Sequence, residues 1–495
     1  MLERLSAAFH GKIFFVLIAI YALFGVFFIL SGLLNYDEGF YLYESKLVYS
    51  GKLPYIDFLY TQPPLFLYVY GLPQFLFGNS LYVGRTTSLI FGILTCIFLF
   101  RLAKKIGGEP AANISLALLA LNPYAIYYLT LAKTYALASF LLVLSMYFLV
   151  NENIKNPKRS ALSVFFMCLA VGVRLSVAPA LILLLIYIFY TQRKNFGVIK
   201  YSLLTAVLTC SIIFLPFFAL DKDIAAFDLL EYRQTQLFGT TISQDIISKI
   251  ALFPSLANKY FVIISLIALG AVSRFIRKDF FPNSMTTFMF FIVASIFLFN
   301  FLLTLTVAEY QTIIVPLAAA IAGYIFGGIY KNSQEGFIKF SFAALIILMI
   351  LLTPLSQRGI RVDLSNLTPL QQVEDFADAV KGKAPDGGKL LAFNTILAVE
   401  SGMDVLPGTE ISMFSYFPSW ENEKAKKYHV VNKEILDGYI ESKAAAAILL
   451  TSFEIETLKI ENSTLKLIEE NYNLEKTAEN WGPWGDTAYL YFPKS

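Results

Sequence analysis

The stretch "LLNYDEGFYLYESKLVYSGKLPYIDFLYTQPPLF", residues 33–66, decides how the chain is interpreted. Two adjacent carboxylates, Asp37 and Glu38, come directly after an apolar run, 12–34, that is long enough to cross a membrane. Charged side chains are costly in a bilayer, and those found beside membrane spans are candidates for function. The first question is therefore what two acids do at the edge of a membrane.

The composition indicates an integral membrane protein. Of the 495 residues, 57% are hydrophobic and only 15% are charged, whereas a soluble domain has about 25% charged residues. The three cysteines all lie in apolar runs, so they do not indicate a compartment. We expect membrane lipid as a partner and no nucleic acid.

The apolar runs predict about eleven transmembrane helices. The run 160–190 is too long for one span and is interrupted by Gly172, Arg174 and Pro179, so it predicts two helices that meet near Arg174. The run 63–78 is short and contains three prolines, which favours an interfacial or re-entrant segment. The other predicted spans are 12–34, 81–100, 110–131, 134–150, 201–220, 260–273, 284–307, 311–330 and 337–355.

The basic residues predict the topology. Lys and Arg cluster in alternate loops, and with an odd number of spans these loops all lie on the side of the N-terminus, which is therefore the cytoplasmic side. The run 12–34 lacks a cleavage site and is expected to stay as an anchor. We therefore predict a cell-membrane protein with a transmembrane catalytic domain, 1–355, two outer loops, 35–80 and 221–259, and an extracytoplasmic domain, 356–495.

The C-terminal domain has the pattern of a small α/β domain. Residues 369–381 suit a helix, and "KLLAFN" and "AAAAILLTS" are typical of buried strands. The alternating "TAYLYFP" near the end predicts an edge strand. This acidic domain carries 14 Lys and Arg against 21 Asp and Glu, consistent with a position outside the cell.

Two interpretations of the Asp-Glu pair remain open. Residues 35–51 show helical spacing and end at Gly51, which predicts an amphipathic helix along the outer surface. In the first interpretation, Asn35 and Glu38 form a capping box for this helix. In the second, a carboxylate takes a proton from an acceptor hydroxyl as a general base, or the pair holds a divalent cation. Adjacent helical side chains point about 100° apart, so we favour Asp37 as the group that faces the site.

Basic and aromatic side chains on the same side are candidates for binding substrate. Arg174, Arg85 and Lys133 are each predicted near the outer ends of helices, and arginine is well suited to phosphate. A simpler interpretation is that the arginines extend to the interface without binding anything. Tyr310 is a further candidate, although it also fits an interfacial aromatic belt.

The sequence resembles a known family at these residues. The segment "DEGFYLYESKLVYSGKLPYIDFLYTQPPLFLYVYG" resembles the first outer loop of the GT-C polyprenyl-phosphate-sugar glycosyltransferases, which include the dolichyl-phosphate-mannose protein mannosyltransferases and the lipid A aminoarabinose transferases. The shared features are the Asp-Glu pair after the first span, Tyr41, "GxxPYxDF" and "PPL". The following segment, with Arg85 in "GRTTS" and a later "ALNP", resembles the next two spans. The resemblance covers roughly residues 33–135.

The resemblance implies transfer of a sugar, with inversion, from a polyprenyl or dolichyl monophosphate to an acceptor on the outer face. Asp37 corresponds to the catalytic carboxylate of the family, with Glu38 beside it. Basic residues, here Arg174 and Arg85, are expected to hold the phosphate, and Asp57 in "PYIDF" either contributes to the site or caps a turn. The acceptor is a protein, a lipid or a glycan.

The sequence departs from the family pattern in two respects. Some members have a second acid in the outer turn between the third and fourth spans, where this chain has Lys133. Some use a histidine as a metal ligand, whereas the only histidines here are His10 and His429. If a divalent metal ion binds, we expect Asp37 and Glu38 to hold it; the other candidate acids on the outer side are Glu44, Asp57, Asp245 and Glu309.

Different functions fit the same composition. A transporter would have pairs of broken helices at the membrane midplane, and only the segment 172–179 has that character. A scaffold whose outer domain acts alone is a second possibility, and an oligosaccharide transferase that uses a lipid diphosphate is a third. Replacement of Asp37 would separate a monophosphate-dependent transferase from the transporter and the scaffold.

Overall fold

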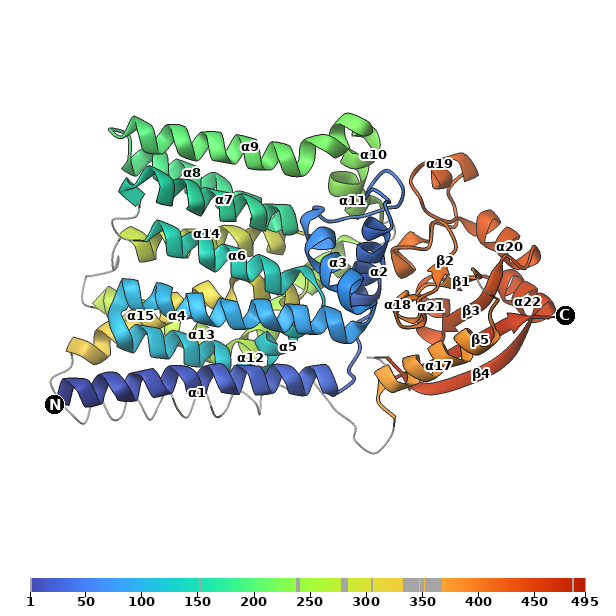
Figure 1. Cartoon of the computed structure of the whole chain (residues 1–495), viewed down its shortest axis with the longest axis horizontal. Coiled ribbons are helices and arrows are strands. Elements are labelled where there is room, and N and C mark those ends of the chain that lie inside the picture. Colours follow the sequence, from blue (N-terminus) through green and yellow to red (C-terminus); the bar gives the residue numbers. More distant parts are fainter. Residues whose placement is uncertain are drawn as a thin grey trace.

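The computed structural model describes residues 2–150, 154–236, 241–276, 284–303, 306–332, 367–385, 387–482 and 485–494, together with the single positions 347 and 351. A bundle of long helices forms most of the molecule, and a smaller domain with a β-sheet covers one end of the bundle (Figure 1). This arrangement confirms the predicted polytopic helical architecture with a C-terminal α/β domain.

Five of the described helices are long and apolar enough to cross a membrane. The number rises to seven if each of two bent pairs is counted as one span. The five are residues 12–30 of α1 (Leu2–Leu30), α4 (Leu81–Ala120), α9 (Phe196–Leu220), α14 (Ser284–Leu302), and residues 308–327 of η4 (Ala308–Ile314) and α15 (Val315–Asn332). The bent pairs are α5 (Pro123–Thr130) with α6 (Thr134–Leu149), at 106°, and α12 (Ile242–Lys259) with α13 (Phe261–Ile276), at 92°.

The helix α4 contains two of the predicted spans, because it turns back at Gly108. Gly108 has φ +77°, a left-handed conformation that a glycine adopts without strain. The Ser88 hydroxyl donates to the Leu131 carbonyl at 2.7 Å. If α4 were straight, Ala120 would lie about 48 Å from Ser88, and the eleven residues from Ala120 to Leu131 could not bring the chain back over that distance. The chain therefore reverses its direction within α4, at Gly108.

The long run 160–190 is broken near Arg174, as predicted. The helix α7 (Pro157–Val173) ends one residue before Arg174, which has extended dihedral angles. A short 3-10 turn, η2 (Leu175–Val177), then leads into α8 (Ala178–Thr191). The predicted span 337–355 lies outside the described residues, apart from positions 347 and 351.

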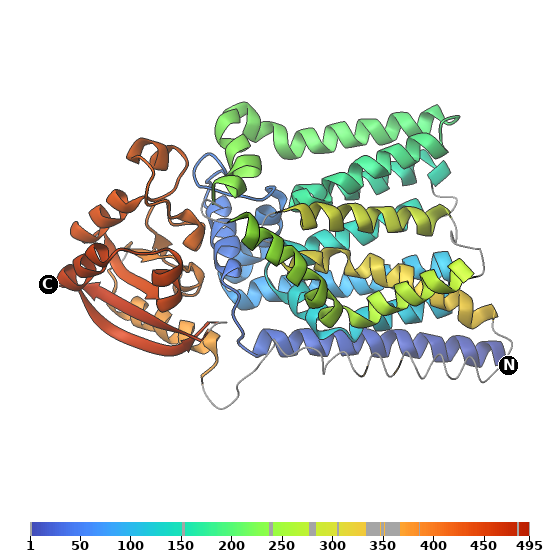
Figure 2. The same cartoon turned by 180° about the vertical axis from the view of Figure 1, so that it is seen from behind.

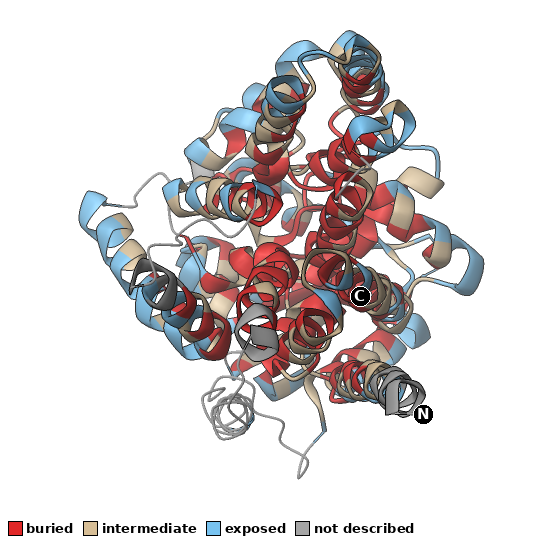
Figure 3. Ribbon diagram, turned by 90° about the vertical axis from the view of Figure 1, so that its left-hand side faces the viewer, coloured by how far each residue is buried: buried red, intermediate tan, exposed pale blue. Residues whose placement is uncertain are grey.

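Apolar side chains on the outside of the bundle are consistent with a membrane environment. In the end-on view of Figure 3, buried residues lie in the middle of the bundle and exposed residues lie on the outward faces. Several of these outward residues are large and apolar, which is costly in water and favourable in lipid; examples are Ile186, Phe189, Ile212, Leu215 and Phe291.

Two short helices lie where the bundle meets the C-terminal domain. The helix α2 (Asp37–Tyr49) lies across the end of the bundle and does not run along it, as predicted (Figure 1). The exposure expected of an amphipathic helix is wrong, because nine of its thirteen residues are buried and the C-terminal domain covers the face that was expected to meet water. The helix α3 (Leu65–Phe77) is too short to span and exposes Phe75, Leu76 and Phe77, which agrees with the predicted interfacial segment.

The C-terminal domain contains a five-stranded sheet in the order β2-β1-β3-β5-β4. Strands β2 (Asp404–Val405), β1 (Lys389–Ala392) and β3 (Ala445–Thr451) are parallel, and β5 (Asp486–Pro493) is antiparallel to both β3 and β4 (Tyr472–Trp481). The prediction of "TAYLYFP" as an edge strand was wrong, because β5 lies inside the sheet. Its alternation reflects one buried and one partly buried face, and the edge strand is the charged β4.

The remaining elements of the C-terminal domain are short helices around this sheet. The predicted helix over 369–381 is confirmed as α17. A capping box between Thr368 and Gln371 stabilises the start of this helix. The helices are α17 (Pro369–Lys383), α18 (Ile396–Ser401), η5 (Ser412–Ser415), α19 (Asn422–Lys427), α20 (Lys433–Glu441), α21 (Ser452–Thr457) and α22 (Asn462–Asn471). The predicted domain boundary at 355/356 lies outside the described residues.

The N-terminal end of α1 and the C-terminal domain lie at opposite ends of the bundle (Figures 1 and 2). The predicted outer loop 221–259 lies at the same end as the C-terminal domain. Its described residues form α10 (Lys222–Ala226), η3 (Phe227–Glu231), α11 (Tyr232–Gln236) and the whole of α12. The candidate site residues therefore gather at one end of the bundle, beneath the C-terminal domain.

Candidate active site

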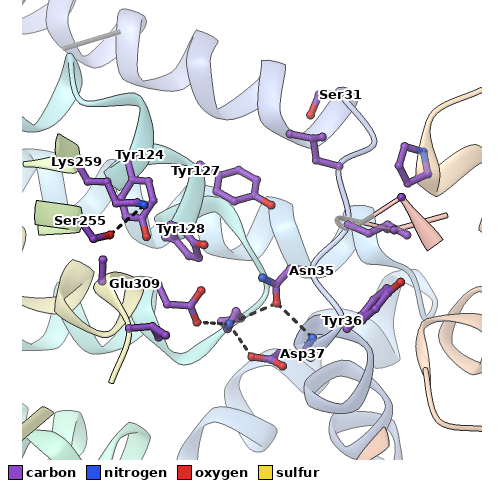
Figure 4. Close-up of a pocket in the computed structure, with 18 of the residues that line it drawn as sticks. Ser31, Asn35, Tyr36, Asp37, Tyr124, Tyr127, Tyr128, Ser255, Lys259 and Glu309 are labelled. Carbon is purple, nitrogen blue, oxygen red and sulfur yellow. Dashed lines mark hydrogen bonds and ion pairs between the residues drawn. The ribbon is translucent and has the colours of Figure 1, made fainter. Parts of the chain in front are cut away.

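A cavity of about 1500 Å³ opens at the end of the bundle that carries the C-terminal domain. Its wall comes from the start of α2, from α5, from α12, from η4 and from the C-terminal domain (Figure 4). Many of the lining residues carry hydroxyl, amide or aromatic groups, among them Ser31, Asn35, Tyr36, Tyr124, Tyr127, Tyr128, Ser255, Asn258, Gln372, Phe414 and Asn480.

Lys133 binds two carboxylates in this cavity. Its Nζ lies 2.7 Å from Asp37 Oδ2 and 2.8 Å from Glu309 Oε1, and Figure 4 shows the two acids on either side of this nitrogen. The break between α5 and α6 places Lys133 directly before α6. Lys133 is buried, whereas the side chain of Asp37 remains 32% exposed and lines the cavity. Asp37 is therefore both held in place and accessible.

Two neutral side chains complete this arrangement. The Asn35 amide oxygen accepts from Lys133 Nζ at 3.4 Å and from the Asp37 backbone at 3.3 Å. The Tyr135 hydroxyl donates to Glu309 Oε1 at 2.9 Å. The predicted capping box is wrong, because Tyr36 occupies the cap position and the Glu38 carboxylate points elsewhere.

Glu38 and Arg85 form a buried pair beside the cavity. Glu38 accepts from Arg85 Nε at 2.9 Å and from Arg85 Nη2 at 2.5 Å, and it also accepts from the Ala132 backbone at 2.9 Å. Arg85 Nη2 also donates to the Leu33 carbonyl. Glu38 and Arg85 are almost completely buried, and neither lines the cavity. The geometry supports a structural role for this pair instead of the predicted catalytic and phosphate-binding roles.

The predicted metal site between Asp37 and Glu38 does not fit this geometry. Asp37 binds Lys133 and Glu38 binds Arg85, so each carboxylate has its own protein cation. Among the residues that the structure describes, no three His, Cys, Asp or Glu side chains are grouped to hold a metal ion.

Two arginines and two tyrosines form a second polar cluster, close to Asp37. The Arg174 guanidinium lies 4.8 Å from the Tyr135 ring centroid and 5.2 Å from that of Tyr310. Arg233 lies 5.4 Å from the same Tyr310 ring. Arg174 also donates to the Thr134 hydroxyl, but its buried Nε has no hydrogen-bond partner in the described part of the chain. The cluster thus contains a buried arginine N–H group without an acceptor among the described residues, although neither arginine lines the cavity.

Tyr41 connects the two clusters along α2. It lies one turn beyond Asp37, is buried, and interacts electrostatically with Asp37, Lys133 and Arg174. Glu44 lies a further turn along the same face, and neither of its buried oxygens has a hydrogen-bond partner among the described residues. Burial raises the pKa of Glu44 well above its ordinary value, and Glu410 and Asp228 raise it further. Asp37 is thus the solvent-accessible acid on this face.

Asp57 lies in a turn away from the cavity. Its carboxylate accepts from the Leu53 backbone at 2.6 Å, and its own backbone N–H donates to the Leu53 carbonyl. The side chain is exposed and does not line the cavity. This geometry supports the turn-capping interpretation of Asp57.

Glu309 was predicted only as one of several candidate acids on the outer side, and Arg233 and Lys259 were not predicted as site residues. Glu309 pairs with Lys133, and Arg233 belongs to the arginine cluster. Lys259 lines the cavity, 4.8 Å from the Tyr124 ring centroid. Arg233 and Lys259 both belong to the predicted outer loop 221–259. Basic residues usually lie in cytoplasmic loops, so their presence in an outer loop is an exception. That exception was the signal that could have marked them as functional candidates.

Comparison with known proteins gives one family match and several structural matches. Residues 61–219 match the family model described as dolichyl-phosphate-mannose-protein mannosyltransferase. No curated protein matches the chain in sequence.

The structural matches extend over nearly the whole chain. ArnT from Cupriavidus metallidurans bound to undecaprenyl phosphate has a TM-score of 0.60 at 12% identity, over 96% of this chain and 97% of ArnT. The Archaeoglobus fulgidus oligosaccharyltransferase tethered with an acceptor peptide has a TM-score of 0.52 at 12% identity, over 96% of this chain and 74% of that one. The oligosaccharyltransferase AglB from the same organism, in complex with an inhibitory peptide and a dolichol-phosphate, has a TM-score of 0.50 at 12% identity, over 96% of this chain and 74% of that one. The chain therefore has the GT-C fold of these membrane glycosyltransferases.

Proposed function

We propose that the chain is an integral membrane glycosyltransferase. It moves a sugar from a polyprenyl or dolichyl monophosphate to an acceptor hydroxyl on the outer face of the cell membrane, with inversion at the anomeric carbon. The observation that carries this proposal is the accessible Asp37 carboxylate, which a buried lysine holds at the wall of a cavity. The charge pattern of the sequence favours a cytoplasmic N-terminus and a C-terminal domain outside the cell.

In the proposed reaction Asp37 acts as a general base. The carboxylate takes the proton of the acceptor hydroxyl, and the acceptor oxygen forms a bond to the anomeric carbon. The bond from that carbon to the phosphate oxygen breaks, and the polyprenyl phosphate leaves with the electron pair. Lys133 orients the carboxylate through the 2.7 Å ion pair, and Glu309 and Asn35 in turn fix the lysine.

The arginine cluster is the proposed site for the donor phosphate. Arg174 and Arg233 lie at similar distances from the Tyr310 ring, and the Arg174 Nε is buried without a partner among the described residues. Guanidinium groups bind phosphate oxygens in a planar geometry, and they stabilise the charge that grows on a phosphate leaving group. Tyr41 borders both this site and Asp37.

The similar proteins support a lipid-phosphate donor. One of the structures contains undecaprenyl phosphate and another contains a dolichol-phosphate, and the matching family is described by its dolichyl-phosphate-mannose donor. We therefore propose a polyprenyl- or dolichyl-phosphate sugar as donor and a protein, lipid or glycan as acceptor.

A donor panel tests this function. The full-length chain, reconstituted in lipid nanodiscs, is incubated with radiolabelled polyprenyl-phosphate mannose, glucose and galactose and with an extract of membrane lipids and glycans. We expect turnover of one donor, release of polyprenyl phosphate and a product of inverted anomeric configuration. Asp37→Asn should abolish turnover, whereas Asp223→Asn, which changes an exposed acid in the same outer region, should not.

Two further outcomes would indicate a different function. Turnover of a polyprenyl-diphosphate oligosaccharide in place of every monophosphate would indicate an oligosaccharide transferase. Uptake of a solute into sealed vesicles without breakdown of any donor would indicate a transporter.

A further inference from the structure

The C-terminal domain binds α2, the helix that carries Asp37, along the whole length of one face. Residues 36, 39, 43 and 46 follow one another at intervals of three and four, so they share one side of a helix. Each of these four residues contacts the C-terminal domain. Asp37 and Tyr41 lie on a different side of α2 and face the bundle.

The contact nearest to Asp37 is made by the residue before it. The Tyr36 hydroxyl donates to Asp486 Oδ2 at 2.6 Å, and Tyr36 and Asp486 are both buried. A side chain at Gly482 would have its Cβ 2.1 Å from the Tyr36 hydroxyl, and Gly482 has φ +70°. The tyrosine therefore packs tightly against Gly482, directly after β4. Gly482 and Gly485 also line the cavity.

Three more contacts follow along the helix. A Cβ at Gly39 would lie 2.6 Å from the Ile396 backbone nitrogen, so only glycine allows α18 to come this close. The Tyr43 hydroxyl accepts from the Val405 backbone at 3.0 Å. Lys46 donates to the Gly402 carbonyl at 2.8 Å and pairs with the carboxylate of Asp404 at 3.0 Å.

These contacts have a consequence for the catalytic carboxylate. Asp37 is the first residue of α2, and its backbone N–H bonds to the side chain of Asn35. The position of its carboxylate therefore depends on how the first turn of α2 is held. The hydrogen bond between Tyr36 and Asp486 holds the residue directly before that turn against the C-terminal domain. Displacement of a catalytic group by about 1 Å can lower a rate about 100-fold.

We propose that the C-terminal domain positions Asp37, and that Tyr36 and Asp486 are the positioning residues, acting through the hydrogen bond that connects the start of α2 to the start of β5. This inference rests on the proposed function of Asp37. It assigns the domain a part in the catalytic step, in addition to its place in the wall of the cavity.

The test compares variants of this hydrogen bond. In nanodiscs, with the polyprenyl-phosphate sugar that the donor panel identifies, we expect kcat of Tyr36→Phe and Asp486→Ala to fall about tenfold or more, with the KM for the donor changed less than about twofold. Asp486→Asn keeps an acceptor oxygen and should retain several-fold more activity than Asp486→Ala. Lys383→Gln, which removes an exposed ion pair with Glu475 in the same domain, is the control and should retain the wild-type rate.

A second measurement needs no substrate. Hydrogen–deuterium exchange of the full chain should show faster exchange of the first turn of α2 in Tyr36→Phe and Asp486→Ala, with α17 unchanged. Wild-type kcat and wild-type exchange in these variants would overturn the inference, as would equal losses in Asp486→Asn and Asp486→Ala. An active Asp37→Asn would instead refute the proposed function, so the two failures are distinguishable.

Discussion

Lys133 is a buried cation that two carboxylates share, and its removal is predicted to affect both folding and activity. Lys133→Met leaves the partly buried Glu309 carboxylate without its cation; an unpaired charge costs about 3–5 kcal/mol when it is fully buried and less when it is partly exposed. It also frees Asp37 to turn away from the substrate. We expect a lower thermal midpoint and at least a 100-fold loss of donor turnover, measured by a thermal unfolding assay and by release of polyprenyl phosphate.

A second substitution separates these two effects. Lys133→Met with Glu309→Gln no longer has an unpaired charge at position 309, so the thermal midpoint should recover while turnover stays low. Full recovery of turnover would show that the lysine acts only on stability.

The Glu38–Arg85 pair leads to the same expectation for the stability of its double variant. Arg85→Met alone leaves the buried Glu38 carboxylate without its cation and should destabilise the protein by about 3–5 kcal/mol. Arg85→Met with Glu38→Gln should regain much of that stability, as a double-mutant cycle of thermal midpoints would show. If both single variants are as stable as the wild type, the pair has no structural role.

At the residue scale, the sequence predicted which side chains gather but not how they pair. Asp37, Lys133 and Arg174 were each expected near the outer end of a helix, and the structure brings them into neighbouring clusters. The partners could not be predicted, because Glu309 is 176 positions from Lys133 and only the packing of η4 against α6 brings them together. Adjacent acids diverge around a helix, which is why Asp37 and Glu38 meet different cations.

At the scale of single elements, the helix α21 of the C-terminal domain predicts a pH dependence. Burial raises the pKa of Glu454 from 4.5 to about 8. Between these two values the folded state keeps a proton that the unfolded state has lost, so stability falls as pH rises through this range. Glu454→Gln should therefore flatten the pH dependence and raise the thermal midpoint at pH 8.5 by about 2–4 °C or more.

Differential scanning fluorimetry of the full chain at pH 5 and pH 8.5 measures this difference. Glu456→Gln, in the same helix, is the matched control, because Glu456 is exposed. Equal pH dependence in the wild type and Glu454→Gln would contradict the assignment.

The element α2 shows where sequence patterns stop being informative. The apolar spacing and Gly51 predicted a helix in this region, and α2 runs from Asp37 to Tyr49. The pattern could not show that α2 is covered on both sides, since its polar residues Tyr43 and Lys46 bond to backbone groups of a domain more than 350 positions away. A face that meets another domain through polar contacts has the same pattern as a face that meets water.

At the scale of the whole molecule, the alternating basic loops make a prediction about orientation. A single cysteine placed at Ser463 of the C-terminal domain, in a background without Cys96, Cys168 and Cys210, should react with an impermeant maleimide added outside intact cells. A cysteine at Lys194, between α8 and α9, should react only after the cells are opened. Labelling of Lys194→Cys in intact cells would contradict the predicted topology and indicate the opposite orientation.

The overall fold was largely predictable, because its determinants are local. The apolar runs, the break at Arg174 and the strands "KLLAFN" and "AAAAILLTS" all appear where they were expected. The sheet order was not predictable from these patterns. The strand β4 is rich in charge, with "NLEKTAEN" along an exposed edge, so it lacks the apolar signal on which strand prediction depends.

The proposed function rests on Asp37 accepting the proton of the acceptor at the outer end of the helix bundle. The most direct test is the single-turnover rate of sugar transfer in nanodiscs for Asp37→Asn beside Glu44→Gln, a change to a buried acid two turns along the same face of α2. We predict a loss of at least about 1000-fold for Asp37→Asn and a rate within about threefold of wild type for Glu44→Gln, with similar thermal midpoints for the two variants. Transfer by Asp37→Asn at the wild-type rate would refute this role of Asp37.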